Sequence, residues 1–325
     1  MAKIHPELFQ EYELRGIIGR TEMRRLGRTL AQYFQKLPPD EELIIAKDQS
    51  GLVESLQAVL VDQLLQAGLK LADLGEVPSP LFYFAPHHLD YSKGVFLSAG
   101  ADGSLGLVIL NEKQLIHGKE LQRLAMLFRQ LATVSSLSSE QGRVRSVSMM
   151  IPYMRMLRQK LKFARQPKIV VDFQCRYDAF FVTYLFVSLG CEVSSVDCQP
   201  HFFQKEPPYD EKERLADLGD VVRLEKADLG FLFASGGEGL IVVDEKGKVV
   251  SSQKLMPLFL EEMLAQRPGG VLVKRNCPEE LVGKIRELGG TPIFYKAISP
   301  LATGAELAKH GAIFAMDRGH LFFRK

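Results

Sequence analysis

The sequence predicts an α/β protein made of consecutive domains with mixed, mostly parallel sheets, and three observations support this. Short apolar runs typical of buried strands alternate with amphipathic segments of helical period along the whole chain. Gly68 and Gly190 directly follow predicted helices, where a C-cap belongs. The 325 residues leave room for two or three domains, each with its own core.

The first predicted domain covers residues 1–145. Its strands and helices alternate at a spacing typical of a mostly parallel sheet that helices cover on both faces. In chain order, the predicted elements are a strand over residues 12–18, a helix near 23–37, a strand over 42–46, a helix over 53–67, a strand over 70–74, a short helix after Pro80 and a strand over 94–98.

The second domain (residues 146–253) and the third (residues 254–325) repeat this alternation. A polar stretch over residues 133–145, rich in Ser and Gln, separates the second domain from the first. The second domain is predicted to hold a helix, a strand over 168–172, a helix over 177–189, a strand over 192–196 and a hairpin over 239–250. The third is predicted to hold a helix over 255–265, a strand over 270–274, a helix over 279–288, a strand near Ile293 and a strand over 321–323.

Composition and charge exclude several classes of function. The formal net charge is +2, so no bulk electrostatic field would attract nucleic acid or an anionic membrane. The N-terminus has no apolar signal region, and no apolar run reaches the roughly 20 residues that span a bilayer. We expect a cytoplasmic protein whose cysteines are buried free thiols, because their spacing fits neither CxxC nor a zinc site: Cys175, Cys191, Cys198 and Cys277.

Short motifs recur along the chain in a characteristic order. They are YELRG at residues 12–16, AKDQS at 46–50, DLGEVPSP at 73–80, ADLG at 227–230, VDEKG at 243–247 and AMDRGH at 315–320. In order and spacing they resemble the α-D-phosphohexomutase superfamily, of the phosphomannomutase/phosphoglucomutase type. The resemblance implies the family's first two domains and a shortened third, while the family's fourth, phosphate-binding domain has no counterpart.

The resemblance implies chemistry in which a phosphoserine moves a phosphoryl group between the C6 and C1 oxygens of a hexose phosphate. Aligned on the strand over 94–99, the phosphoserine position is Gly100, which has no hydroxyl. Ser98 is expected to point to the other side of the strand, and Ser104 lies beyond the loop. We therefore expect both to be ordinary strand-edge or turn serines, with no catalytic residue in the chain.

The family's Mg²⁺ site is also changed. The resemblance implies three aspartates at this site, but Ala234, Gly236 and Glu238 stand at their positions and Gly239 replaces the loop's arginine. Mg²⁺ prefers several carboxylate oxygens. We therefore expect no metal and no other cofactor, with Glu238 a solvated residue.

Residues that match the family's cleft are candidates for residual ligand binding: Arg15, Lys47, Lys93, Asp317 and His320. Two other interpretations stay open. The cationic residues are more typical of a solvated basic rim, and His320 is equally typical of a structural histidine.

These observations favour a non-catalytic relative of the mutases that acts as a binding or assembly partner and retains weak hexose-phosphate binding. A protein partner or an oligomer would follow from that role, whereas nucleic acid and membrane are not expected. The alternative is an active phosphohexomutase with a displaced site. A third hypothesis is an interaction module, with residues 312–316 and 321–323 contributing exposed apolar surface unless they are core.

Overall fold

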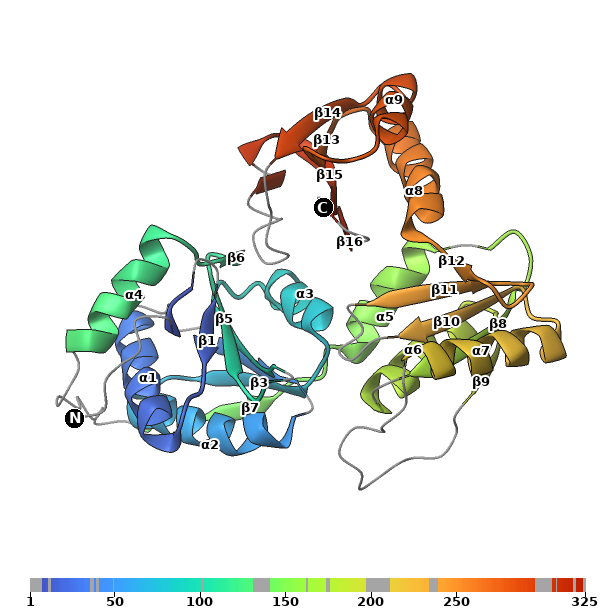
Figure 1. Ribbon diagram of the computed structural model, residues 1–325. Coiled ribbons are helices and arrows are strands. Elements are labelled where there is room, and N and C mark those ends of the chain that lie inside the picture. The colour runs from blue at the N-terminus through green and yellow to red at the C-terminus, as the bar shows by residue number, and fades with distance from the viewer. Residues whose placement is uncertain are drawn as a thin grey trace. The chain divides into compact units, whose positions relative to one another are not determined.

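The computed structural model describes most of the chain (Figure 1). The described residues are 8–10, 13–35, 38, 41–48, 50–100, 102–130, 141–161, 163–173, 176–196, 211–233, 239–295, 306–307, 309–317 and 320–323. They form an α/β fold with three mixed sheets, as the sequence predicts. The chain divides into two compact units, residues 1–160 and 161–325.

The first unit is built on a seven-stranded sheet with the strand order β1-β5-β4-β2-β3-β7, and β6 pairs with β5. Its strands are β1 (Leu14–Gly16), β2 (Leu43–Lys47), β3 (Leu71–Glu76), β4 (Gly94–Ala99), β5 (Leu105–Asn111), β6 (Gln114–Leu115) and β7 (Val144–Ser146). Its helices are α1 (Arg20–Tyr33), α2 (Gly51–Gln66), α3 (Ser79–Leu89), α4 (Lys119–Gln130) and α5 (Met150–Lys160). β2 runs parallel to β3 and β4, whereas β5 is antiparallel to both β4 and β1.

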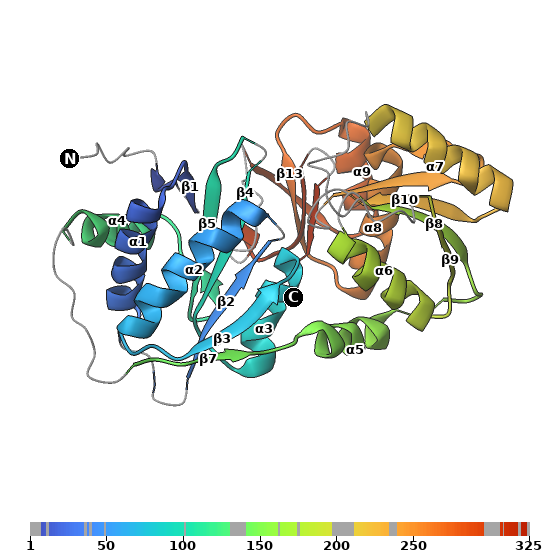
Figure 2. The same cartoon turned by 90° about the horizontal axis from the view of Figure 1, so that it is seen from below.

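Helices cover both faces of this sheet, because β2 is apolar on both sides (Figure 2). Leu43 and Ile45 belong to the core shared with α1, α2 and α4. The opposite face packs on α3, where the rings of Phe82 and Phe96 lie 5.3 Å apart. Gly27 lets α1 and α2 approach closely, since a Cβ atom there would lie 2.7 Å from the side chain of Gln63.

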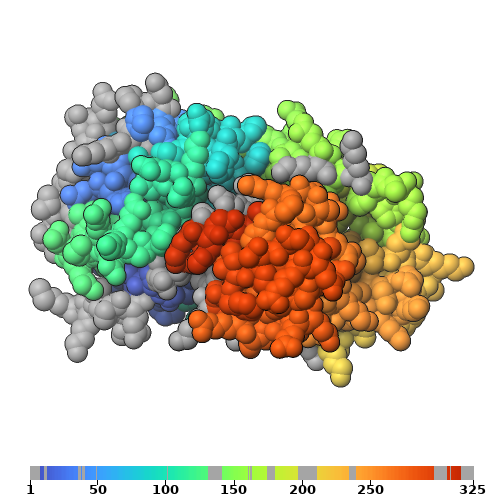
Figure 3. Space-filling view, turned by 90° about the horizontal axis from the view of Figure 1, so that it is seen from above, coloured from blue at the N-terminus to red at the C-terminus, as the bar shows by residue number. Residues whose placement is uncertain are grey.

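The second unit holds two sheets, with strand orders β12-β11-β10-β8-β9 and β14-β13-β15-β16. Its strands are β8 (Lys168–Phe173), β9 (Glu192–Ser195), β10 (Leu229–Phe233), β11 (Leu240–Asp244), β12 (Val249–Val250), β13 (Gly270–Lys274), β14 (Thr291–Tyr295), β15 (Ala312–Asp317) and β16 (His320–Phe323). Its helices are α6 (Arg176–Ser188), α7 (Glu211–Glu225), α8 (Ser252–Gln266) and α9 (Glu279–Glu287). In the space-filling view the orange-to-red atoms of the last sheet and its helices form one contiguous body (Figure 3).

Two features of the predicted domain boundary differ from the structure. The end of the predicted separator, Val144–Ser146, is the edge strand β7 and pairs in parallel with β3. Its side chains are exposed, so it lacks the apolar alternation by which strands are recognised. Helix α5, predicted to open the second domain, falls in the first unit, where Tyr153 packs 5.2 Å from the ring of Phe84.

The apolar segment 312–316 was a candidate for exposed surface. It forms most of β15, and Phe314 is fully buried in the core with α8 and β13. The alternative use of this segment as core is therefore confirmed for Phe314. Among the helices that the structure describes, none has the length and apolarity needed for a bilayer crossing.

Edge strand β7 is attached to the sheet by a side-chain contact as well as by its ladder. Arg145 donates to the Glu42 carboxylate at 2.7 and 3.2 Å, and the Glu42 side chain is only 7% exposed. We expect Arg145→Ala to lower the free energy of unfolding by about 1–2 kcal/mol, because it leaves a buried acceptor poorly satisfied. Urea unfolding measures this. Arg143→Ala is the control, and an equal loss in both variants would contradict the prediction.

Candidate functional site

The loop that joins β4 to β5 lies at the carboxyl end of β4. The Gly100 N–H donates to the Ser104 carbonyl at 2.7 Å, and the Gly103 N–H donates to the Gly100 carbonyl at 2.9 Å. Gly103 has φ +76°, a left-handed conformation that favours glycine. The loop therefore turns tightly enough to bring Ser104 back beside Gly100.

Arg15 reaches this loop from the neighbouring part of the sheet. Arg15 is the β-ladder partner of Gly106. Its guanidinium lies over that glycine, where a Cβ atom would be only 2.8 Å from the Arg15 Nη2. Glu13 holds the guanidinium through two contacts, 2.7 Å to Nε and 3.1 Å to Nη2. This hydrogen bonding raises the pKa of Arg15, so the side chain is a fixed positive charge.

Three polar groups surround the space that a side chain at position 100 would occupy. A Cβ atom at Gly100 would lie 2.6 Å from the Ser104 Oγ and 2.6 Å from the Asp102 Oδ1. It would also lie 3.0 Å from the Arg15 Nη1. We call Arg15, Gly100, Asp102 and Ser104 the Arg15–Ser104 cluster.

Hydrogen bonds connect the members of this cluster. The Arg15 Nη1 donates to the Ser104 Oγ at 3.4 Å, and the Ser104 N–H donates to the Asp102 Oδ1 at 3.0 Å. Hydrogen bonding by the Ser104 side chain and by its N–H lowers the pKa of Asp102. Asp102 is therefore ionised at neutral pH. The Ser104 hydroxyl lies between a cation and a carboxylate, an arrangement that suits nucleophilic chemistry.

Asp48 fixes the backbone on which the cluster rests. Its Oδ2 accepts from the Ala99 N–H at 2.6 Å, and its Oδ1 accepts from the Ser50 N–H at 2.9 Å. Ser50 is the N-cap of α2. One carboxylate thus connects the end of β4 to the start of a helix.

Lys47 and Lys93, both predicted ligand-binding residues, lie at opposite ends of the sheet. Lys47 ends β2 at the carboxyl edge; it is 9% exposed and lies 3.6 Å from Glu54 and 3.8 Å from Glu76. Lys93 precedes β4, beside the start of β2. Lys47 therefore lies at the edge that carries the cluster, and Lys93 does not.

The expected orientation of Ser98 is wrong. Residues two apart on a strand share a face, so Ser98 lies on the same side as position 100. Its Oγ would be 2.9 Å from a Cβ atom at Gly106, the glycine beneath Arg15. The interpretation of Ser104 as a residue beyond the loop also fails, because the turn returns its hydroxyl to Gly100.

The remaining predicted positions belong to the second unit. Asp317 and His320 are paired residues of the β15–β16 hairpin, and only their backbone is described. Ala234, Gly236 and Glu238, the aligned metal positions, lie outside the described residues. These positions offer a single carboxylate, and the described part of the chain holds no group of three His, Cys, Asp or Glu residues placed to bind a metal. The residues present do not fit a Mg²⁺ cage of the family's kind.

A buried ion pair at the carboxyl end of β8 was not predicted from the sequence. Arg214 on α7 donates to both carboxylate oxygens of Asp172: its Nε lies 3.0 Å from Oδ2, and its Nη2 contacts Oδ1. The same Nη2 also donates to the Phe173 carbonyl at 2.9 Å. The two side chains are 14% and 3% exposed. The sequence offers no local signal for this pair, because 42 positions separate its members.

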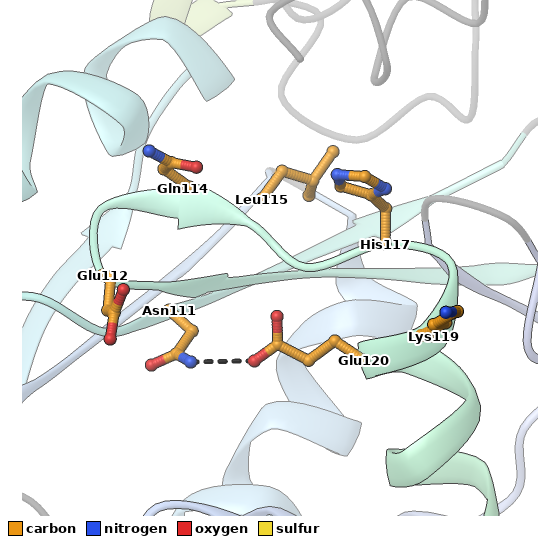
Figure 4. Close-up of a pocket in the computed structure, with 7 residues that line it drawn as sticks. All are labelled: Asn111, Glu112, Gln114, Leu115, His117, Lys119 and Glu120. Atoms are coloured by element: carbon orange, nitrogen blue, oxygen red, sulfur yellow. Dashed lines mark hydrogen bonds between the residues drawn. The ribbon is translucent and has the colours of Figure 1, made fainter. Parts of the chain in front are cut away.

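A cavity of ≈ 410 Å³ lies at the β5–β6 turn and the start of α4 (Figure 4). Asn111 donates to the Glu120 Oε1 at 2.8 Å, and Tyr33 donates to the same oxygen. The residues that line the cavity are Asn111, Glu112, Gln114, Leu115, His117, Lys119 and Glu120. None of them is a predicted site residue. The cavity lies at the far end of β5 from Ser104, roughly 20 Å along the strand.

Fold and cluster together define a multidomain α/β protein with an arginine–serine site at the carboxyl edge of its first sheet. Residues 6–102 match the family described as phosphoglucomutase/phosphomannomutase, alpha/beta/alpha domain I. The phosphomannomutase/phosphoglucomutase of Pseudomonas aeruginosa is 26% identical over 98% of this chain and 70% of its own length. That of Pseudomonas syringae pv. tomato is 28% identical over 100% of this chain and 71% of its own length.

A solved structure extends this similarity to the fold. A phosphoglucomutase/phosphomannomutase family protein from Burkholderia thailandensis superposes with a TM-score of 0.81 at 25% identity, covering 98% of this chain and 72% of its own. The chain is therefore similar to phosphoglucomutase/phosphomannomutase proteins in its first domain by family model, and over almost its whole length by sequence and fold.

The expectation of a non-catalytic protein is contradicted by these comparisons. The relatives that match almost the whole chain are named phosphomannomutase/phosphoglucomutase, which favours an active phosphohexomutase. The expectation rested on Gly100 at the phosphoserine position, on the changed metal-site loop with its Ala234, Gly236 and Gly239, and on the fourth domain without a counterpart. The structure places the Ser104 hydroxyl beside Gly100.

Proposed function

We propose that the chain is an active phosphohexomutase, which moves a phosphoryl group between the C1 and C6 oxygens of a hexose phosphate at a displaced site. One observation carries the proposal beyond family resemblance: a cation, a carboxylate and a hydroxyl surround the space that a side chain at position 100 would take. A transferring phosphoryl group needs positioning and charge stabilisation above all.

Arg15 supplies the positive charge in this proposal. Glu13 holds the guanidinium in place at 2.7 and 3.1 Å, so little reorganisation is needed when a phosphate arrives. A guanidinium also matches phosphate geometry better than an ammonium does. Lys47 lies at the same sheet edge and adds a second cation. Asp102 accepts a proton from the hydroxyl that attacks.

The full chain is expected to convert mannose 1-phosphate or glucose 1-phosphate to the 6-phosphate at enzyme-like rates. The assay includes the matching hexose 1,6-bisphosphate as phosphoryl donor and couples the 6-phosphate product to a dehydrogenase. Heat-treated protein and a reaction without bisphosphate are the controls. Turnover no faster than in these controls, with both sugars, would overturn the proposal.

Location and assembly are further parts of the proposal. We propose a reducing, cytoplasmic setting, supported by the free thiols of Cys191 and Cys277, whose pKa values are raised by burial. We also propose that the enzyme self-associates or binds a protein partner. Sedimentation over a range of concentrations tests self-association, and a single monomer throughout would count against it.

A further inference from the structure

We infer that Ser104 is the phosphoryl carrier of this chain, an inference that rests on the proposed phosphohexomutase activity. The Ser104 hydroxyl lies 2.6 Å from the position that a Cβ atom at Gly100 would take. It therefore occupies, from the β5 side of the hairpin, the space that a side chain at position 100 would fill. The backbone bond from Gly100 N–H to the Ser104 carbonyl, 2.7 Å, holds the two residues together.

The surroundings of the Ser104 hydroxyl match the needs of a phosphorylated nucleophile. Arg15 donates to the Oγ at 3.4 Å and would pair with the phosphate once it is attached. Asp102 orients the hydroxyl and lies where it can take the proton. Ser98 also lies near Arg15, but it faces Gly106 and lies two residues before the loop.

The proposed role requires the buried Ser104 hydroxyl to become accessible to substrate. Ser104 is 4% exposed, whereas Asp102 is exposed at the tip of the loop and contacts the hydroxyl. A Cβ atom at Gly103 would meet nothing within 4 Å, so the neighbouring space is open. Rotation of the exposed Asp102 side chain would remove one of the groups that contact the Oγ. A phosphate on Ser104 would keep that carboxylate away by like-charge repulsion and leave Arg15 as its partner.

The proposed step uses a hexose 1,6-bisphosphate as donor. The Ser104 Oγ attacks phosphorus, the Oγ–P bond forms, and the P–O bond to the sugar breaks. The bonding electron pair leaves with the sugar oxygen, which takes up the proton that the hydroxyl passes to Asp102. The products are phosphoserine and a hexose monophosphate, and reversal onto the other sugar oxygen completes the transfer.

The test is the phosphorylation state of the full chain after incubation with glucose 1,6-bisphosphate. Intact-mass measurement followed by peptide mapping should find one phosphoryl group, on Ser104, in the wild type and in the matched control Ser98→Ala. Ser104→Ala should carry none and should lose at least 100-fold in mutase rate. Thermal unfolding of each variant establishes that it is folded.

The outcomes separate this inference from the proposed function. Mutase activity that persists in folded Ser104→Ala, or a phosphate mapped to Ser98 or elsewhere, overturns the role of Ser104 and leaves the mutase proposal standing. A wild type that neither takes up phosphate nor interconverts hexose phosphates overturns both.

A second pair of variants tests the shared space directly. Gly100→Ser brings a Cβ atom within 2.6 Å of the Ser104 Oγ, so we expect it to unfold at a lower temperature than the wild type. Adding Ser104→Ala removes that oxygen and should restore part of the loss, with phosphate now on position 100. Additive effects on the melting temperature would show that the two side chains do not compete for one space.

Discussion

Replacing Arg15 by alanine is expected to lower kcat/KM for hexose phosphates by about 10²–10³-fold, the usual effect of removing a charge-stabilising donor from a transfer site. The guanidinium is the cation of the Arg15–Ser104 cluster, and Glu13 holds it in place before substrate arrives. The coupled mutase assay measures the loss. Arg15→Lys should recover little, because an ammonium cannot make both contacts to Glu13.

The control for this prediction is Arg24→Ala, which removes an exposed arginine of α1 in the same unit. That variant should keep wild-type kinetics. If Arg15→Ala stays folded and within about twofold of wild type, then Arg15 does not stabilise the transferring group.

Replacing Arg214 by leucine is expected to destabilise the second unit by about 3–5 kcal/mol, because it leaves a buried carboxylate without its cation. The Asp172 side chain is only 3% exposed, and Arg214 satisfies both its oxygens. Urea unfolding gives the free energy. Hydrogen exchange at Val170 and Val171 of β8 shows whether the loss is local to this sheet.

Two further variants identify the cause of this loss. Arg223→Ala breaks an exposed pair with Asp220, and we expect it to cost less than about 1 kcal/mol. The double variant Asp172→Leu, Arg214→Leu should recover most of the stability, because it removes the stranded charge. A double variant as unstable as Arg214→Leu would attribute the loss to packing instead.

The elements that the sequence predicts well are those whose burial follows a simple period. β2 and β4 are continuous apolar runs between turns, and α2 has a clear apolar face, so their positions agree with the structure within a few residues. β7 escaped prediction because its exposed polar residues depend on the neighbouring strand for their conformation. β5 escaped because no motif drew attention to its apolar run.

The site was only half predictable. The family resemblance implies that position 100 is the place of the family's serine and that Arg15 is a residue of the cleft. It cannot show which side chain enters the space left by Gly100, because that depends on the turn at Gly103. At the phosphoserine position, the hypothesis of an inactive chain considered only which residue type stands at position 100. The structure shows which atoms surround the space beside Gly100, and the Ser104 hydroxyl is one of them.

The double contact of Asp48 has a mechanical consequence. The Asp48 carboxylate accepts hydrogen bonds from the N–H groups of Ala99 and Ser50. The last residue of β4 and the N-cap of α2 are therefore linked through one side chain. Thermal motion at the end of β4 is therefore coupled to that at the start of α2. A single side chain thereby stiffens the backbone beneath the Arg15–Ser104 cluster.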